Sequence, residues 1–482
     1  MPKRNLIWTV AVLAAAGVTA LLTRQAATPG RADPNRPALL PVQRVELAIE
    51  ENYYRPVTPR EVLRGSVRGM IEALDEFSSY VPPEKVETFN RRLDGQVTGT
   101  GLCLEGDGPD VRVVGALSGS PASRLDVHRG WRVVRAGGRD ASGLSAEEIA
   151  GLLDAPAQRP VAVVVEGTGG RQEQLLLPRQ RFALETVVGH DRTPEGAWDY
   201  FCTSQPRIGC VRIKEFVDRT PEHFQRAMRE LSGAAGVVLD LRDNPGGSLE
   251  AGYAVANLFL RRGAVFTKVG TGRTEVHEAR GDGTLPYFPM VVLVNGGSAS
   301  AAELVAGALR LHDRAVLVGT RTRGKGFVQS LLPLGDGLGQ MNLTTAEFFV
   351  GTPRHGIRVA RSGDRWGIDP HVELPVAPYD EQTIRRLWLR AEAVYPPGEN
   401  ASHAPRLPTW RRQAGAAAAA LPVLPPALQA DPQLACAVEL LSEPERVERI
   451  LSEAAAARRR AATAPAATAP ADANAAGRDA HD

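Results

Sequence analysis

Ser300 and Lys325 are two residues of this chain whose types could support nucleophilic catalysis without a histidine. They lie in residues 295–303 (Asn-Gly-Gly-Ser-Ala-Ser-Ala-Ala-Glu) and 324–329 (Gly-Lys-Gly-Phe-Val-Gln). A serine becomes a nucleophile when a base takes its proton, and a lysine kept neutral by burial can be that base. Each segment follows an apolar run that predicts a strand. Both residues are therefore expected at strand ends, where open α/β sheets build their sites.

A serine nucleophile also needs N–H donors for the oxyanion. Ser300 precedes a predicted helix over residues 301–311, whose first N–H groups have no partner within the helix, so Ala301 is one candidate donor. Residues 240–248 form a glycine-rich turn after another predicted strand. Gly246 or Gly247 in this turn is the second candidate, because glycine lets the backbone approach a substrate closely.

Lys325 must be uncharged to accept the serine proton. Burial and the positive end of the helix after Ser300 would both lower its pKa. Gln329 follows four residues later, on the same side of a helix or a strand, and could orient the amine. Each residue also has an ordinary structural explanation: Ser300 as a helix cap, Lys325 in a surface turn and Gln329 on an exposed strand. Their joint placement at strand ends favours a site.

Two other functional patterns are nearly present. Residues 319–326 resemble a phosphate-binding loop, but Gly326 stands where that motif needs Ser or Thr to hold magnesium. The nine histidines are scattered and no Gly-x-Ser-x-Gly sequence occurs, so no Ser-His-Asp triad is predicted. The net charge of +2, without a concentrated basic face, predicts no nucleic-acid partner. We predict no cofactor and no metal.

The N-terminus predicts export. Pro2, Lys3 and Arg4 precede an apolar run over residues 6–22, which is the arrangement of an export signal. The run is long enough to remain as an anchor in the cytoplasmic membrane. Residues 23–27 are a poor cleavage site, which favours an anchor while leaving a cleaved peptide open. In both cases the bulk of the chain would lie on the periplasmic or extracytoplasmic side, because positive charge stays inside.

The 482 residues are too many for one ordinary domain, and the chain divides into six predicted segments. These are an anchor and linker (1–38), a helical segment (39–94), a small domain (95–186), an α/β core (187–380), helices with an Ala/Pro-rich linker (381–453) and a disordered tail (454–482). Predicted strands of the core are uniformly apolar, which indicates burial on both faces. Cys202 and Cys210 flank a predicted hairpin turn, so a disulfide and two half-buried thiols both remain open.

The small domain predicts five or six short strands and two helices, an order that resembles a PDZ domain. Such a domain presents N–H groups of a Gly-x-Gly-apolar loop to a peptide carboxylate and adds the peptide to its sheet. The resemblance is carried by Gly99, Thr100, Gly101 and Leu102, with a groove helix over residues 145–153. A Gly-x-Gly alone would equally fit an ordinary turn. Gly130-Trp131 departs from the Gly-Asp usual in these domains.

Several segments, in order over residues 42–376, together resemble the carboxyl-terminal processing peptidases, or tail-specific proteases. Besides the small domain, the matching segments are residues 51–53, 74–75, 78–80, 240–247, 295–303, 324–329, 343–346 and 367–370. The family usually has Asp where this chain has His371, and residues 347–355 match the usual Tyr-x-x-Pro-x-Gly-Arg segment poorly. These departures bear on the level of activity rather than on the catalytic type.

The resemblance implies a multidomain α/β protein, with a crotonase/Clp-like protease core and an inserted PDZ domain. It implies Ser300 as nucleophile, Lys325 as general base and Gln329 as its positioning partner. The donors would be Ala301 and Gly246 or Gly247. The implied function is a serine endopeptidase that captures the free C-terminus of an exported polypeptide and cleaves near it. A homo-oligomer or an adaptor protein stays open as a partner.

Two rival interpretations remain. One is a non-catalytic PDZ scaffold on an inactive peptidase fold, which would bind peptides without cutting them. The other is a crotonase-type acyl-CoA enzyme, which would share the core and the oxyanion turn. That enzyme would need neither an export signal nor Lys325.

Overall fold

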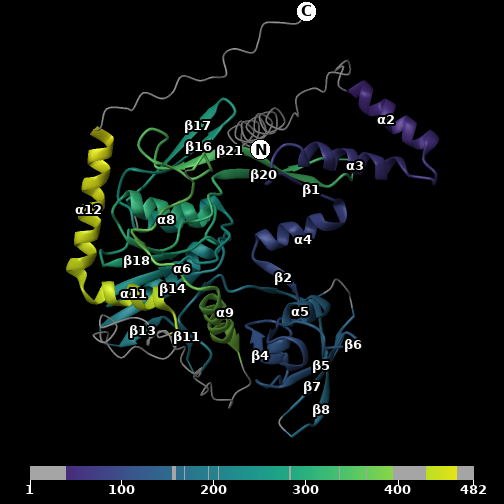
Figure 1. Cartoon of the computed structure of the whole chain (residues 1–482), viewed down its shortest axis with the longest axis horizontal. Coiled ribbons are helices and arrows are strands. Elements are labelled where there is room, and N and C mark those ends of the chain that lie inside the picture. Colours follow the sequence, from purple (N-terminus) through teal and green to yellow (C-terminus); the bar gives the residue numbers. More distant parts are fainter. Residues whose placement is uncertain are drawn as a thin grey trace, which may run out of the picture. The chain divides into compact units, whose positions relative to one another are not determined.

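The computed structural model describes residues 39–154, 159–167, 169–193, 195–204, 206–281, 284–335, 337–364, 366–394 and 430–463 (Figure 1). These residues form two compact units, the first ending at Glu76 and the second beginning at Phe77. The predicted anchor lies outside the described residues, as does residue range 395–429 of the predicted linker. No helix in the described ranges is both long and apolar enough to cross a membrane.

The first unit contains two helices, α2 (Leu39–Asn52) and α3 (Pro59–Glu72). The start of α3 is defined by Thr58, whose hydroxyl accepts a bond from the Glu61 N–H. The Glu61 carboxylate accepts the Thr58 N–H at 2.8 Å in return. This reciprocal capping box satisfies two N–H groups that the helix leaves unpaired.

A seven-stranded sheet forms the centre of the second unit. Five parallel strands follow one another in chain order: β14 (Arg207–Ile213), β15 (Gly236–Asp240), β18 (Met290–Val294), β19 (Val316–Gly319) and β23 (Val372–Glu373). Two short strands pair antiparallel with β14: β10 (Val187–Val188) and β13 (Phe201–Ser204). Because parallel strands end at one edge, the turns after β15, β18 and β19 meet there.

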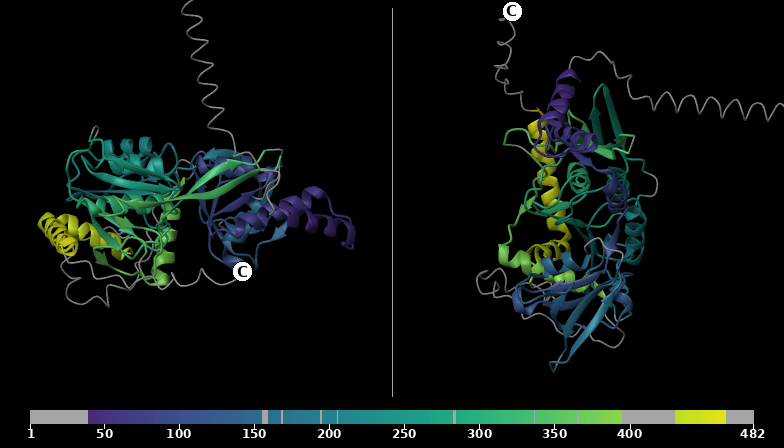
Figure 2. Two further views of the ribbon diagram at one scale, coloured as in Figure 1. Left: turned by 90° about the horizontal axis from the view of Figure 1, so that it is seen from above. Right: turned by 90° about the vertical axis from the view of Figure 1, so that its right-hand side faces the viewer.

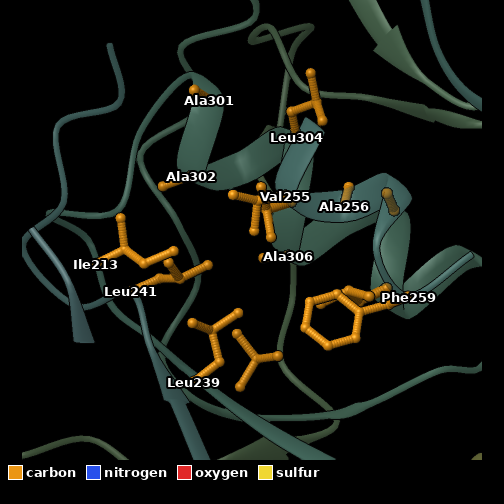
Figure 3. Packing of buried hydrophobic residues seen from close by; sticks show 14 of the residues in the cluster. Ile213, Leu239, Leu241, Val255, Ala256, Phe259, Ala301, Ala302, Leu304 and Ala306 are labelled. Atoms are coloured by element: carbon orange, nitrogen blue, oxygen red, sulfur yellow. The ribbon is translucent and has the colours of Figure 1, made fainter. Parts of the chain in front are cut away.

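One face of this sheet is covered by three helices: α6 (Thr220–Glu230), α7 (Leu249–Asn257) and α8 (Ala301–Leu311). Side chains alternate along the strands, so Val237 and Leu239 face these helices while Val238 faces the other side. Figure 3 shows the apolar side chains of α7 and α8 meeting those of the sheet in one layer. The predicted helix over residues 301–311 is confirmed by α8.

The other face is covered by α11 (Pro432–Ser442) and α12 (Pro444–Thr463), drawn in yellow in Figure 2. These helices explain why the strands are apolar on both sides. The expected start of a disordered tail at residue 454 is wrong, because α12 continues to Thr463. Residues 454–457 are alanines, the strongest helix formers, and they extend a helix already held by buried Leu451. Beneath α11, Cys202 and Cys210 are buried free thiols.

A second, six-stranded antiparallel sheet continues the core. Its strands are β1 (Ser79–Val81), β16 (Ala264–Gly270), β17 (Arg273–Glu278), β20 (Phe327–Pro333), β21 (Gln340–Val350) and β22 (Ile357–Arg358). Helix α8 contacts β16 and β21 of this sheet as well as β19 of the central one. The helix that begins after Ser300 is thus held from both sides.

The small domain has its own core. Its sheet contains β3 (Leu102–Glu105), β4 (Arg112–Leu117), β5 (Arg132–Ala136), β6 (Arg139–Asp140), β7 (Val161–Glu166) and β8 (Gln172–Leu177). Helix α5 (Ala146–Asp154) contacts β3, and β2 (Gln96–Gly99) pairs with β9 (Gln180–Ala183). After α9 (Pro378–Glu392), β24 (Ala393–Val394) pairs with β4. The remaining elements are α4 (Pro83–Leu93), two 3-10 turns (Gly108–Asp110, Ala122–Arg124), β11 (Asp191–Arg192) and β12 (Trp198–Asp199).

Candidate active site

Ser300 lies at the turn that leads from β18 into α8, and it is 7% exposed. Its backbone has φ 53° and ψ −115°. A non-glycine residue is strained in this region, and such strain is concentrated at functional sites. Hydrolases with a Gly-x-Ser-x-Gly sequence place their nucleophile on a sharp strand-to-helix turn. This chain forms a strained turn of the same kind without that sequence.

Lys325 lies in the loop between β19 and β20 and is partly buried. Its Nζ is 5.7 Å from the centroid of the Phe77 ring. Burial lowers the pKa of Lys325, the charge of Arg323 lowers it further, and Glu303 acts in the opposite direction. Among the described residues, no hydrogen bond joins Lys325 Nζ to Ser300 Oγ. The structure therefore brings the two segments together but leaves the amine beside an aromatic ring.

Glu303 joins the two segments. Its Oε2 accepts the Ser300 N–H at 2.9 Å and the Lys325 N–H at 2.8 Å. Because both nitrogens lie next to one oxygen, they are less than about 6 Å apart. Its Oε1 accepts the Thr322 hydroxyl at 2.5 Å and the Gly324 N–H at 2.7 Å. Burial raises the pKa of this fully buried carboxyl, and the four bonds oppose that rise.

Ala301 and the glycine turn lie beside Ser300. A Cβ added to Gly246 would come within 2.6 Å of Ser300 Cβ and 3.0 Å of the Ala301 nitrogen, so only glycine fits there. The Gly246 N–H already donates to Asn244 Oδ1 at 2.8 Å. The N–H groups of Ala301 and Gly247 donate to no described residue. Gly247 is exposed, with φ 123°.

Asn244 explains the position of the glycine turn. It is fully buried, its Nδ2 donates to the Ile213 carbonyl at 2.8 Å, and its own carbonyl accepts the Ala299 N–H at 2.9 Å. The same side chain holds Gly246 through Oδ1. One asparagine thus connects β14, the glycine turn and the residue before Ser300.

Gln329 lies in β20, and its Nε2 is 3.4 Å from Thr344 Oγ1 on β21. Val328 packs against the core, and the pairing of β20 with β21 shifts register between Val328 and Gln329. No described hydrogen bond joins Gln329 to Lys325. Its predicted role towards the amine therefore remains a prediction.

The predicted peptide-binding loop connects β2 to β3. Leu102 begins β3 and is buried, and Gly101 has φ 72°. The Thr100 N–H donates to the carboxylate of Asp154, at the end of α5. One edge of β3 pairs with β4. The other edge pairs with no strand among the described residues.

His371, the departure noted in the sequence, keeps a contact between β19 and β23. Its Nδ1 accepts the Leu317 N–H at 2.9 Å. Burial lowers the pKa of His371 to about 3, so the ring is neutral and can accept this bond. An aspartate oxygen would lie one bond beyond Cγ, as Nδ1 does. The departure therefore preserves the strand contact.

The sequence interpretation assigned no role to Glu303, Thr322 or Asn244. One local signal was present for Glu303, because Ser300 and Glu303 have the Ser-x-x-Glu spacing of a capping box. That pattern predicts a bond to the Ser300 N–H, which the structure has. Nothing local points to the bonds with residues 322–325. The described residues contain no cluster of three or more His, Cys, Asp or Glu that could hold a metal.

Comparisons with known proteins identify the class. A family model described as Peptidase family S41 matches residues 207–374, which include Ser300 and Lys325. The chloroplastic C-terminal processing peptidase of Tetradesmus obliquus is 32% identical over 359 residues, covering 70% of this chain and 74% of that protein. The carboxyl-terminal-processing protease of Synechocystis is 32% identical over 317 residues, covering 64% and 71%.

Among solved structures, the photosystem II D1 C-terminal processing protease is 28% identical, with a TM-score of 0.43, and covers 74% of this chain and 99% of its own. The sequence matches establish the chain as a serine-type peptidase. More specifically, it belongs to peptidase family S41 and is a carboxyl-terminal processing peptidase. The family predicted from the sequence motifs is confirmed.

Glu303→Gln is expected to lower turnover of an unstructured protein substrate by about 10²-fold, a loss of roughly 3 kcal/mol. The amide can keep only one acceptor oxygen and turns an N–H₂ group towards N–H donors of the two segments. Turnover would be measured with thermal unfolding as a check on folding. Glu250→Gln, an exposed acid on α7, is the matched control. Full activity in the Glu303 variant would contradict the bridging role.

Proposed function

We propose that this peptidase cleaves exported polypeptides near their free C-termini with a Ser300–Lys325 dyad. The observation that carries the proposal is the Glu303 oxygen that accepts the backbone N–H groups of both residues. The strained backbone of Ser300 and the lowered pKa of Lys325 support it further. Backbone strain and the burial that lowers a lysine pKa both cost free energy. Such features are concentrated at functional sites rather than in ordinary surface turns.

In the proposed reaction, the neutral Lys325 amine takes the Ser300 hydroxyl proton while Oγ attacks the scissile carbonyl. The oxyanion that forms accepts bonds from the Ala301 and Gly247 N–H groups. The Lys325 ammonium then gives its proton to the leaving amine, and an acyl-enzyme remains. Lys325 next takes a proton from a water molecule whose oxygen attacks the acyl carbonyl. The bond from the acyl carbon to Oγ then breaks and the Lys325 ammonium gives its proton to Oγ, which releases the new C-terminus and restores Ser300.

Gly247 is preferred over Gly246 as the second donor, because Asn244 already takes the Gly246 N–H. The amine of Lys325 must leave the Phe77 ring to reach Ser300 Oγ, and its flexible four-carbon stem permits this rotation. Gln329 would then hold the amine in its reactive position, from the strand that follows Lys325.

The small domain is proposed to be a PDZ module that captures the substrate C-terminus. The edge of β3 that is not paired with β4 would accept the peptide as an added strand, next to α5. Residues 99–102 would hold its carboxylate. Capture raises the local concentration of the chain at Ser300. We place this activity outside the cytoplasm, with residues 6–22 as an export signal or a membrane anchor.

A fluorophosphonate probe tests the dyad, because it labels only an activated serine. We expect labelling of the intact protein and of Ser442→Ala, a serine on α11, but none of Ser300→Ala. Mass spectrometry of the labelled peptide should identify Ser300. An intact, folded protein that binds peptides but takes no label would instead support the rival non-catalytic scaffold.

A further inference from the structure

The loop proposed to hold a substrate carboxylate already contacts a carboxylate of this chain. Asp154 Oδ1 accepts the Thr100 N–H at 2.8 Å and lies 3.2 Å from the Thr100 hydroxyl oxygen. Asp154 is the last residue of α5 and is exposed, whereas Thr100 is 1% exposed. A solvent-facing acid thus uses a buried backbone donor of this loop.

Glycine permits this contact. A Cβ added to Gly99 would lie 2.6 Å from Asp154 Oδ1 and 2.8 Å from its Cγ, so the carboxylate rests against the Gly99 backbone. The next glycine, Gly101, packs as closely on Ser120, where an added Cβ would lie 2.2 Å from the Ser120 Cβ. The loop is therefore shaped around the Asp154 carboxylate on one side and packed on the domain on the other.

Two hydrogen bonds fix the orientation of the carbonyl groups of Thr100 and Gly101. The Leu117 N–H donates to the Gly101 carbonyl at 2.8 Å, and the Ala122 N–H donates to the Thr100 carbonyl at 2.9 Å. The loop carbonyls thus point into the domain. The Gly101 N–H donates to no described residue, and it follows directly on the Thr100 N–H that Asp154 occupies.

Arg179 holds the last turn of α5, which ends at Asp154. The Arg179 guanidinium donates to the Leu153 carbonyl, and its second nitrogen donates to the Leu152 carbonyl at 2.9 Å. These bonds satisfy carbonyl groups that the end of α5 leaves unpaired. The last turn of α5 is therefore fixed, which keeps the backbone of Asp154 next to the loop.

We propose that Asp154 sets the affinity of the small domain for substrate C-termini, because its carboxylate occupies a donor that the substrate carboxylate needs. The inference rests on the proposed capture function. Two carboxylates at one donor repel each other, so a peptide must displace Asp154 or bind against its charge. Substrates are captured only when their apolar C-terminal residues add enough binding energy to offset that repulsion.

The charge of Asp154 can be separated from its hydrogen bond. The side-chain oxygen of asparagine accepts the Thr100 N–H just as the carboxylate does, so Asp154→Asn keeps the loop satisfied and removes only the charge. Asp154→Ala removes both and opens the loop. Glu147→Gln, an exposed acid in the first turn of α5, is the matched control for net charge.

The experiment uses the full chain carrying Ser300→Ala, so that bound peptide is not cut. The probe is a fluorescein-labelled peptide ending in Leu-Val, with either a free carboxylate or a C-terminal amide, and fluorescence anisotropy reports binding. We expect Asp154→Asn to bind the free acid at least about fivefold more tightly than its parent, with the amide unchanged. Asp154→Ala should also bind the free acid more tightly than its parent does. Glu147→Gln should bind it with the same affinity as the parent.

Two results would overturn the inference in different ways. If the parent prefers the acid to the amide but both Asp154 variants, folded by thermal unfolding, bind the acid no more tightly, Asp154 does not set affinity and the capture function stands. If no variant distinguishes the acid from the amide, the loop does not recognise a C-terminal carboxylate. The capture function then fails together with the inference.

Discussion

Lys325→Arg is expected to lower peptide hydrolysis by about 10⁴-fold, the upper range for loss of a general base. Arginine keeps the positive charge and a similar length, but its guanidinium does not lose a proton in proteins. Packing beside Phe77 and the backbone bond to Glu303 should survive, since neither needs an amine. The loss would therefore report proton transfer rather than folding. Turnover of an unstructured protein substrate is the measurement.

The pH dependence of the unmodified enzyme gives the same base a second test. Burial and Arg323 lower the pKa of Lys325 below its ordinary value of 10.5. The amine is active when neutral, so kcat/KM should rise with pH through that lowered pKa and level off above it.

The matched control for the Lys325→Arg variant is Lys268→Arg, on β16, which should keep full activity. An active Lys325→Arg enzyme would remove this lysine from the mechanism.

Asp431→Ala is expected to lower the free energy of unfolding by about 3 kcal/mol, the lower end of the usual cost of removing one partner of a buried ion pair, because Asp240 remains as a counter-charge. The partner is Arg242, which is 2% exposed and lies between Asp240 and Asp431. Asp431 accepts two bonds from it, at 2.9 Å and 2.7 Å. It also caps α11 by accepting the Leu434 N–H at 3.0 Å.

The shift of the urea unfolding midpoint would measure this effect, with Glu445→Ala in the first turn of α12 as control. Arg242 lies in the turn that continues to Asn244 and to Gly247, the proposed oxyanion donor, so the folded fraction of Asp431→Ala should also lose activity. A midpoint change equal to that of the control would mean that Arg242 finds another counter-charge. The unfolding midpoint reports the structural role of Asp431. The activity of the folded fraction reports whether that role extends to the turn beside Ser300.

Local sequence patterns predict the two strands and the helix that position Ser300 and Lys325. The apolar runs before Ser300 and Lys325 are β18 and β19, and the helix after Ser300 has its predicted bounds. Local patterns predict a glycine turn next to Ser300, but they do not distinguish Gly246 from Gly247. That choice depends on where the Asn244 side chain points, which no short pattern encodes.

Long-range contacts account for what was missed. Arg242 and Asp431 are 189 residues apart in the chain, so no local pattern connects them. Glu303 reaches the Lys325 loop 22 residues away, and only its capping bond to Ser300 has a sequence signature. The apolar strands predicted a covered second face but did not identify α11 and α12 as its cover.

The packing of α11 and α12 on the central sheet also has a consequence for the order of folding. A chain that emerges from the ribosome starts with its N-terminal part. Until residues 430–463 arrive, the outer side of the central sheet is bare and Arg242 lacks one of its two counter-charges. A carboxyl-terminal processing peptidase thus depends on its own helices α11 and α12, and loss of residues 430–463 would expose the apolar face of the central sheet to water.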